Sequence, residues 1–111
     1  MRLSSHVLDG TRGAPAVGVA VRWERRDGDA WQVVATAVTG EDGRVTEWGS
    51  AEDLSDGTHR LVFDSGGYFS GRGVETFYPE VVVVFTVDDP TRHHHVPLLL
   101  SPFAYSTYRG S

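Results

Sequence analysis

The sequence is dominated by a period-two alternation of apolar and polar side chains, which is the pattern of a half-buried β-strand. Between residues 17 and 24, valines and a tryptophan fall on one side, and glycine, alanine and charged residues fall on the other. Asp27-Gly28 then marks a turn, and residues 31–38 are predicted to form the returning strand of a hairpin. This pattern favours an all-β fold.

Further segments of strand character follow, separated by short turn signals. Glu41-Asp42-Gly43 leads into a strand at residues 44–48, and residues 49–57 are predicted to form a loop. Strands are also predicted at residues 59–63, 81–85, 92–100 and 105–108. The valine run at 81–85 predicts a well-buried strand, and Pro79 before it suits a strand start or a sheet edge.

One short helix is predicted between Asp64 or Ser65, as N-cap, and Gly73. With about eight strands, these elements indicate an antiparallel β-sandwich. No linker or repeat divides the chain, so we expect a single domain over residues 1–111. A chain of this length can form one hydrophobic core, which leaves few residues to enclose a deep pocket. We therefore expect a neighbouring chain to complete an active site.

The composition excludes several classes of function. The 111 residues include 15 Asp and Glu against ten basic residues, all of them Arg, and the net charge is −5. Phosphate binding needs a basic field, so we expect no nucleic-acid partner. Without Lys or Cys there is no Schiff-base lysine, Walker phosphate loop or thiol nucleophile. No signal peptide or bilayer-spanning stretch is recognised, so a cytoplasmic location without a membrane partner is expected.

The histidines are concentrated in one run, His93, His94 and His95, with His6 near the start of the sequence. Because side chains alternate along a strand, His93 and His95 share a face with Pro97, whereas His94 joins the aliphatic face. We interpret His94 as a core-margin residue and His93 as a loop-end residue. His95 lies within the strand on the face opposite the aliphatic one, where a polar group indicates a function.

A candidate site follows if the polar faces of three predicted strands coincide in space. The combined surface would hold two imidazoles, a phenol and a hydroxyl among apolar walls, supplied by His6, Leu8, His95, Pro97, Leu99, Ser106 and Tyr108. Two imidazoles with ordinary pKa values of about 6.5 can supply a base and an acid near neutral pH. Arg44 would add a fixed positive charge, unless it is an ordinary solvated arginine.

A metal site competes for the same histidines. His6, His93 and His95 could form a three-histidine zinc site, because strand residues two apart face the same way. No acidic residue stands out in the sequence as a partner for the ligand imidazoles. We therefore favour a site without metal.

Two segments resemble the signatures of a known family. Residues 4–9, Ser-Ser-His-Val-Leu-Asp, followed by Gly-Ala-Pro-Ala-Val-Gly-Val at 13–19, resemble the N-terminal signature of the transthyretin-like 5-hydroxyisourate hydrolases. The run His-Val-Pro-Leu-Leu-Leu-Ser-Pro at 95–102, with Tyr-Ser-Thr-Tyr-Arg-Gly-Ser at 105–111, resembles their C-terminal signature. Gly43-Arg44 and residues 77–81 resemble internal blocks of the family. The resemblance covers essentially the whole chain, and its closing tetrapeptide is one that true transthyretins lack.

The resemblance implies a transthyretin-like antiparallel β-sandwich that hydrolyses 5-hydroxyisourate to 2-oxo-4-hydroxy-4-carboxy-5-ureidoimidazoline in urate degradation, without a metal or another cofactor. It also implies a homotetramer, a dimer of dimers, with its sites in a channel where two dimers meet. By motif matching, it assigns His6, Arg44 and His95 to catalysis and places residues 108–111 at the site.

From these assignments we expect the two histidines to activate water and Arg44 to hold the substrate. Ser106, Tyr108 and Ser111 are expected to contribute to substrate binding, and the end of the chain at Ser111 to form part of the site.

The sequence departs from the family at two positions and in the loop at residues 9–12, without losing a motif residue. His94 stands where the family commonly has an aromatic residue, and Ala104 where it often has glycine. The alternative function is that of a carrier with the same fold, which binds a flat aromatic ligand without turnover. The two histidines and the closing tetrapeptide favour the enzyme, because a passive apolar channel has no need of imidazoles.

Overall fold

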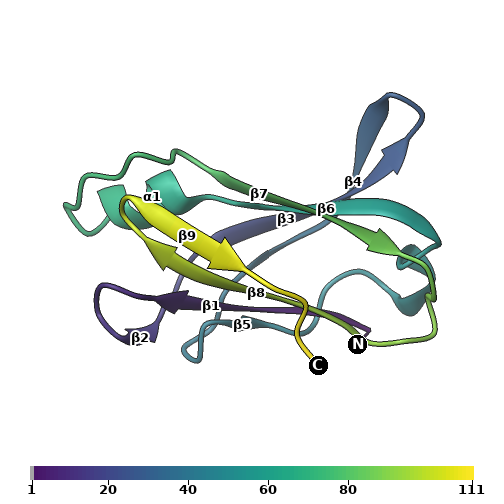
Figure 1. Cartoon of the computed structure of the whole chain (residues 1–111), viewed down its shortest axis with the longest axis horizontal. Helices are drawn as coiled ribbons and strands as arrows, with labels where there is room; N and C mark the ends of the chain where they lie inside the picture. Colours follow the sequence, from purple (N-terminus) through teal and green to yellow (C-terminus); the bar gives the residue numbers. More distant parts are fainter. Residues whose placement is uncertain (1) are drawn as a thin grey trace.

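Two β-sheets face each other, with one short α-helix at one end of the sandwich (Figure 1). The structure is a computed structural model and describes residues 2–111. The sheets run in the order β2-β1-β8-β9, with β5 also paired to β1, and β4-β3-β6-β7. Among residues 2–111, no helix has the length and hydropathy needed to cross a bilayer.

The elements have the following bounds. The first sheet contains β1 (Leu3–Asp9), β2 (Ala14–Pro15), β5 (Arg44–Val45), β8 (His94–Ser101) and β9 (Ala104–Thr107). The second contains β3 (Ala20–Asp27), β4 (Ala30–Val38), β6 (Gly57–Phe63) and β7 (Val81–Val87). The short 3₁₀ helix η1 covers Ala51–Asp53, and α1 covers Ser65–Ser70.

The predicted all-β sandwich is confirmed, with one pair that departs from the antiparallel pattern. β1 and β8 run parallel, with Leu3 opposite His94 and Asp9 opposite Leu100. Antiparallel direction follows from short hairpin turns. All strands of the second sheet lie between β1 and β8 in the sequence. The connection is therefore long enough for β8 to run parallel to β1.

The valine-rich strand is less buried than its sequence predicts, and the expectation of a well-buried strand is wrong. β7 is an edge strand of the second sheet, and Val82 and Val84 are exposed while Val81 and Val87 are buried. An edge strand has neighbours on one side only, so alternate side chains face outward. Pro79 precedes β7, in keeping with the predicted strand start or edge.

Other boundaries shift by a few residues. The alternation that predicts the first hairpin strand starts at Val17, but β3 begins at Ala20. Val17 is exposed, and Val19 is the first buried valine of the alternation. The strand predicted at 44–48 is reduced to the two residues of β5, which pair with Ser5 and His6.

The predicted helix α1 is confirmed, and it is anchored to the end of β1. The Asp64 carboxylate accepts a hydrogen bond from the Gly67 N–H at 2.9 Å, which caps the helix. Tyr68 donates its hydroxyl to the buried carboxylate of Asp9 at 2.8 Å, and the same carboxylate accepts the N–H groups of Thr11 and Arg12. Asp9 therefore fixes the end of β1 to the helix and to the following loop.

The space between the sheets is filled by one apolar cluster that includes Trp23, Phe63 and Leu98. Burying a side chain of this size contributes about 1.5–3 kcal/mol. Trp48 also belongs to this cluster, and its indole N–H donates to the Leu3 carbonyl at 3.0 Å. Since the inward faces of β1 and β8 are committed to this core, their outward faces are held at fixed positions.

The turn before β5 depends on a glycine. Gly43 has a φ of +77°, and a Cβ at this position would overlap the Val7 carbonyl oxygen. The Gly43 carbonyl accepts the N–H of Val7 at 2.8 Å. The close approach of Gly43 to β1 places Arg44 directly beside His6.

We predict that Gly43→Ala lowers the free energy of unfolding by more than Gly28→Ala does. Gly28 also has a positive φ, +62°, but a Cβ there meets nothing within 4 Å. The control therefore carries only the left-handed backbone cost of about 1–2 kcal/mol. Urea unfolding followed by tryptophan fluorescence measures both variants, and equal losses would show that the contact with β1 has no energetic role.

Candidate active site

Strand pairing brings the predicted polar faces together on the outer side of the first sheet. His6 lies opposite Arg44 of β5 and opposite Pro97 of β8, and Ser4 lies opposite His95. Paired residues of neighbouring strands project from the same face. His6, Arg44 and His95 therefore share one face, as the candidate site requires.

A hollow of about 460 Å³ opens on this face. Its lining consists of Ser4, Arg44, Thr46, Glu47, His93, His95 and Ser111. Arg44, His95 and Ser111 were predicted as site residues from the sequence, whereas Ser4, Thr46 and Glu47 were not. The alternation contains a signal for two of the missed residues, because Ser4 is two positions from His6 and Thr46 is two positions from Arg44.

His95 is half-buried at the edge of the hollow, and its Nδ1 lies 2.8 Å from the Ser4 hydroxyl oxygen. Burial lowers the pKa of His95 below its ordinary value, and the positive charges of Arg44, His93 and His6 lower it further. The ring is therefore neutral at neutral pH. A neutral imidazole in this position can accept a proton.

His6 is held by the turn that precedes Arg44. Its Nε2 lies 2.9 Å from the backbone carbonyl oxygen of Asp42. A carbonyl oxygen only accepts, so Nε2 carries the hydrogen and donates it. In the neutral ring this leaves Nδ1 of His6 as the free acceptor.

Arg44 presents an exposed guanidinium to the hollow. Its backbone N–H donates to the Asp42 carboxylate at 3.0 Å, which fixes the residue at the turn. Across residues 2–111, the ion pairs are those of Glu24 with Arg22 and Arg60 and do not involve Arg44. The guanidinium of Arg44 is thus available for a planar, polar ligand.

The end of the chain passes against His95. The Gly110 N–H donates to the His95 carbonyl at 2.9 Å, and a Cβ on Gly110 would overlap the imidazole ring. Glycine is needed here because the backbone lies directly on the ring. Ser111 follows and lines the hollow.

Three predicted site residues do not line this hollow: His6, which lies next to Arg44, and two residues near the end of the chain, Ser106 and Tyr108. Tyr108 is 68% exposed and lines a second hollow of about 420 Å³, of which His94 and His95 also form part. Ser106 lies opposite Leu99 on β9 and lines a smaller depression. Within one chain, the structure does not bring Ser106 or Tyr108 to the hollow that Arg44 lines.

The other two histidines of the run behave differently. His94 is buried, as predicted for a core-margin residue, and its Nδ1–H donates to the Arg92 carbonyl at 3.0 Å. His93 lies just before β8, as predicted for a loop end, but its Nε2 is 2.8 Å from the Ser4 hydroxyl oxygen.

In the part of the chain described, no three His, Cys, Asp or Glu residues form a group that could hold a metal ion. His6, His93 and His95, the residues of the alternative zinc site, are not among such groups.

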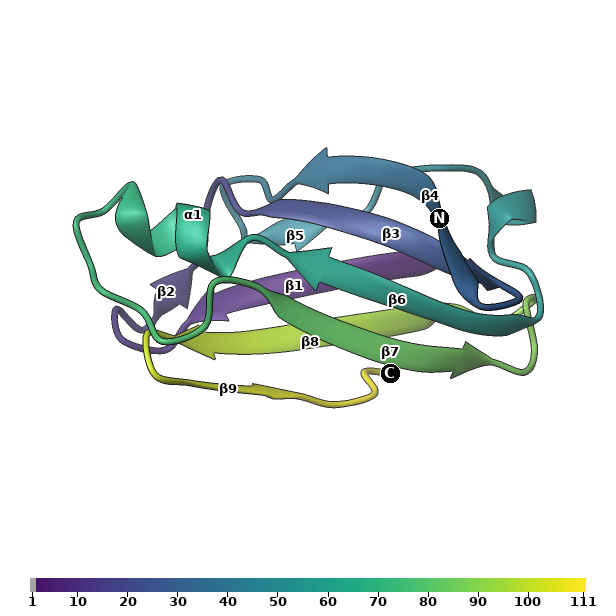
Figure 2. The ribbon, with the colours of Figure 1, turned by 90° about the horizontal axis from the view of Figure 1, so that it is seen from above.

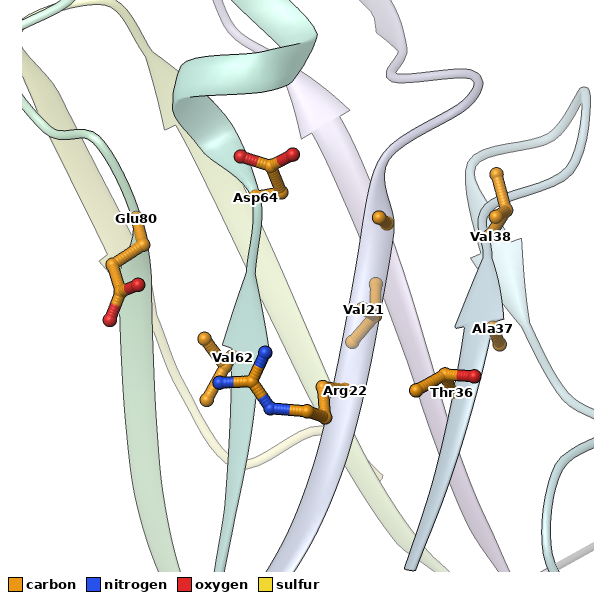
Figure 3. Close-up of a pocket in the computed structure, with 9 residues that line it drawn as sticks. Val21, Arg22, Thr36, Ala37, Val38, Val62, Asp64 and Glu80 are labelled. Carbon is orange, nitrogen blue, oxygen red and sulfur yellow. The ribbon is translucent and has the colours of Figure 1, made fainter. Parts of the chain in front are cut away.

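A more voluminous hollow lies elsewhere. Figure 3 shows it over β3, β4 and β6 of the second sheet, with Arg22, Asp64 and Glu80 around it. It measures about 600 Å³, and no histidine lines it. Size alone does not identify the site, since this hollow lacks a group that titrates near neutral pH.

Comparison with known proteins agrees with this fold. A family model described as the HIUase/Transthyretin family matches residues 3–110. A probable 5-hydroxyisourate hydrolase of Caenorhabditis elegans is 46% identical over 110 residues, covering 98% of this chain and 81% of that protein. A 5-hydroxyisourate hydrolase of Mus musculus is 44% identical over 111 residues, covering 98% and 94%. The crystal structure of sea bream transthyretin in complex with thyroxine superposes with a TM-score of 0.94 at 31% identity, covering 99% and 95% of the two chains.

We predict that Arg44→Gln raises the pKa of His95, because the substitution removes a positive charge that disfavours the imidazolium. Arg26→Gln removes a guanidinium that does not contribute to the lowered pKa of His95, and it serves as the control. The pKa values are measured by NMR titration of the ring protons. An equal His95 pKa in wild type and Arg44→Gln would contradict the electrostatic contact.

Proposed function

This chain belongs to the HIUase/Transthyretin family, and we propose that it is the enzyme that hydrolyses 5-hydroxyisourate to 2-oxo-4-hydroxy-4-carboxy-5-ureidoimidazoline in urate degradation. Relatives that carry this hydrolase name align with nearly the whole chain. The observation that carries the proposal is the hollow that places an unpaired guanidinium and a neutral, half-buried imidazole on one sheet face. These two groups suit hydrolysis of a flat, carbonyl-rich ring.

His95 is the base in this proposal. Its Nδ1 is engaged by Ser4, so Nε2 is the nitrogen left to take a proton from water. The hydroxide then attacks the ring carbonyl, and the C–N bond of the cyclic amide breaks. A proton returns to the leaving nitrogen from an imidazole, and His6 is either the hydrogen-bond partner of the reacting groups or the acid. Because the pKa of His95 is lowered, the ring stays neutral, and therefore basic, even at a pH below the ordinary pKa of histidine.

Arg44 holds the substrate and stabilises the transition state. A guanidinium forms two parallel hydrogen bonds with carbonyl oxygens in one plane, which fixes the orientation of a flat ligand. As water adds to the carbonyl, negative charge develops on its oxygen, and a fixed cation beside it lowers the barrier.

Assembly would complete the site. The first sheet and the segment that follows β9 expose large apolar side chains on or beside the site face, including Leu8, Leu99 and Tyr108. The edge strands β7 and β9 lie along the same side of the sandwich (Figure 2). Exposed apolar surface and open strand edges favour pairing with further copies of the chain. We therefore propose a homotetramer, a dimer of dimers, in which Ser106, Tyr108 and Ser111 contribute to substrate binding.

Three other expectations from the sequence stay predictions. These are the single domain over residues 1–111, the cytoplasmic location and the absence of a metal or another cofactor. The carrier alternative is supported by the likeness to a transthyretin that was crystallised with thyroxine. A carrier would bind a flat ligand on this face and leave the spontaneous decay of 5-hydroxyisourate unchanged.

We predict that His95→Asn and His6→Asn each lower the rate of hydrolysis by about 10²- to 10⁴-fold, the usual contribution of a general acid or base. Arg44→Lys should also cause a large loss, because an ammonium cannot reproduce the planar guanidinium. The decay of freshly generated 5-hydroxyisourate is followed by absorbance after exhaustive chelation, with Arg26→Gln as the control. Near wild-type rates in both folded histidine variants would refute the two-histidine mechanism, and activity that returns only with zinc would favour the metal site.

We also predict that deleting residues 108–111 lowers activity far more than stability. The segment covers the His95 ring and lines the hollow, but the buried core contains none of these residues. The rate of hydrolysis and the thermal midpoint are measured on the same preparation. Unchanged activity in the shortened chain would exclude a role for the tail in the site.

A further inference from the structure

A buried serine links two imidazoles behind the proposed site. Ser4 is only 6% exposed, and its hydroxyl oxygen lies 2.8 Å from Nε2 of His93 and 2.8 Å from Nδ1 of His95. The function proposed above assigns no role to Ser4 or to His93. A hydroxyl has one hydrogen to donate and can accept at the same time, so it can connect a donor nitrogen to an acceptor nitrogen.

The Ser4 hydroxyl has a single hydrogen and cannot donate to both rings, so at least one ring donates to it. If Nδ1 of His95 carries the hydrogen and donates to Ser4, the hydroxyl is free to donate to Nε2 of His93. Nε2 of His95 then has a free lone pair, as a base needs. The reverse direction would place the hydrogen on Nε2 of His95 and remove its basic lone pair. His95 can therefore act as the base only where its Nδ1 donates to Ser4.

The surroundings favour a positive charge on His93 over one on His95. His93 is exposed and His95 is half-buried, and a charge is held at lower cost where water reaches it. Other ionisable groups lie around His95 on the neighbouring elements. They are His6 of β1, Arg44 of β5, Glu47 after β5, and Tyr108 and Arg109 after β9. Of these, His6 and Arg44 act against a positive charge on His95, as does His93 itself.

We propose that Ser4 and His93 form a proton relay behind His95, in which His93 is a positioning residue that holds the proton taken from water. When Nε2 of His95 gains that proton, the Nδ1 proton of His95 passes to the Ser4 oxygen, and the Ser4 hydroxyl proton passes to Nε2 of His93. Ser4 is unchanged, His93 becomes the imidazolium, and His95 is neutral with its hydrogen on Nε2. When His95 gives this hydrogen to the leaving ring nitrogen, the transfers run in reverse, so that all protons are accounted for.

The relay rests on the proposed hydrolase function, but the direction of its hydrogen bonds can be measured without any substrate. It also explains how one imidazole can act first as base and then as acid. In this scheme His6 orients the water or substrate through its Nδ1, and it need not exchange a proton.

The kinetic test compares four variants of the full-length protein. Ser4→Ala removes the relay hydroxyl and Ser4→Thr retains one. His93→Gln keeps a hydrogen-bonding side chain that cannot be protonated. Ser5→Ala is the matched control, because Ser5 is a buried serine of the same strand whose hydroxyl donates to the Val96 carbonyl and not to an imidazole.

We predict that Ser4→Ala and His93→Gln each lower kcat by at least about 10-fold, a share of what general acid–base catalysis supplies, with little change in KM. Ser4→Thr and Ser5→Ala should retain kcat near the wild-type value. A wild-type kcat in both Ser4→Ala and His93→Gln would overturn the relay. A loss in Ser4→Ala alone would also overturn it, since His93 would then have no part in proton transfer.

The structural test uses ¹⁵N NMR of the imidazole rings in the protein without substrate. We expect wild-type His95 to carry its hydrogen on Nδ1, and Ser4→Ala to shift it toward Nε2, while Ser5→Ala leaves it unchanged. A wild-type His95 with its hydrogen on Nε2 would overturn the relay. This measurement separates the two proposals, because a protein that leaves 5-hydroxyisourate decay unchanged refutes the hydrolase function, whereas the ring tautomer tests the relay directly.

Discussion

The parallel pairing of β1 with β8 is the constraint on which the site depends. It joins segments from opposite ends of the sequence and sets Ser4 beside His95 and His6 beside Pro97. A shift of one residue in this register would turn the histidines of one strand toward the core. The register is fixed from the inside, because the alternate residues of both strands belong to the buried cluster between the sheets. The packing of the core therefore determines the geometry of the chemistry on the outer face.

The charge balance at the candidate site is opposite to that of the whole chain. The protein has a net charge of −5, yet its candidate site gathers one guanidinium and three imidazoles, with Glu47 at the margin. This local excess of positive groups helps to keep His95 neutral and therefore basic. It also suits a substrate with several carbonyl oxygens. Bringing these groups together costs free energy, and a carrier for an apolar ligand would have no use for them.

Much of this arrangement follows from local sequence patterns, and the remainder depends on contacts between distant segments. Alternation along each strand predicts the faces of His6, His94 and His95 correctly, since a side-chain period of two is a local property. It cannot predict the parallel direction of β1 and β8, because strand pairing is set by the whole fold. The role of Ser4 was missed for the same reason, because its two imidazole contacts come from the far end of the chain. Ser106 lies on the expected strand, whereas Tyr108 follows the end of that strand, and the two residues line neighbouring depressions.

The central claim is that strand register brings Arg44 and His95 into one site that acts on one transition state. A double-mutant cycle on kcat/KM for 5-hydroxyisourate hydrolysis tests it directly, with Arg44→Gln, His95→Asn and the double variant compared with wild type. Groups that act on the same reacting atoms are strongly non-additive. The account predicts that the double variant loses far less than the product of the two single losses. Losses that multiply fully would show that the two residues act independently and would contradict the account.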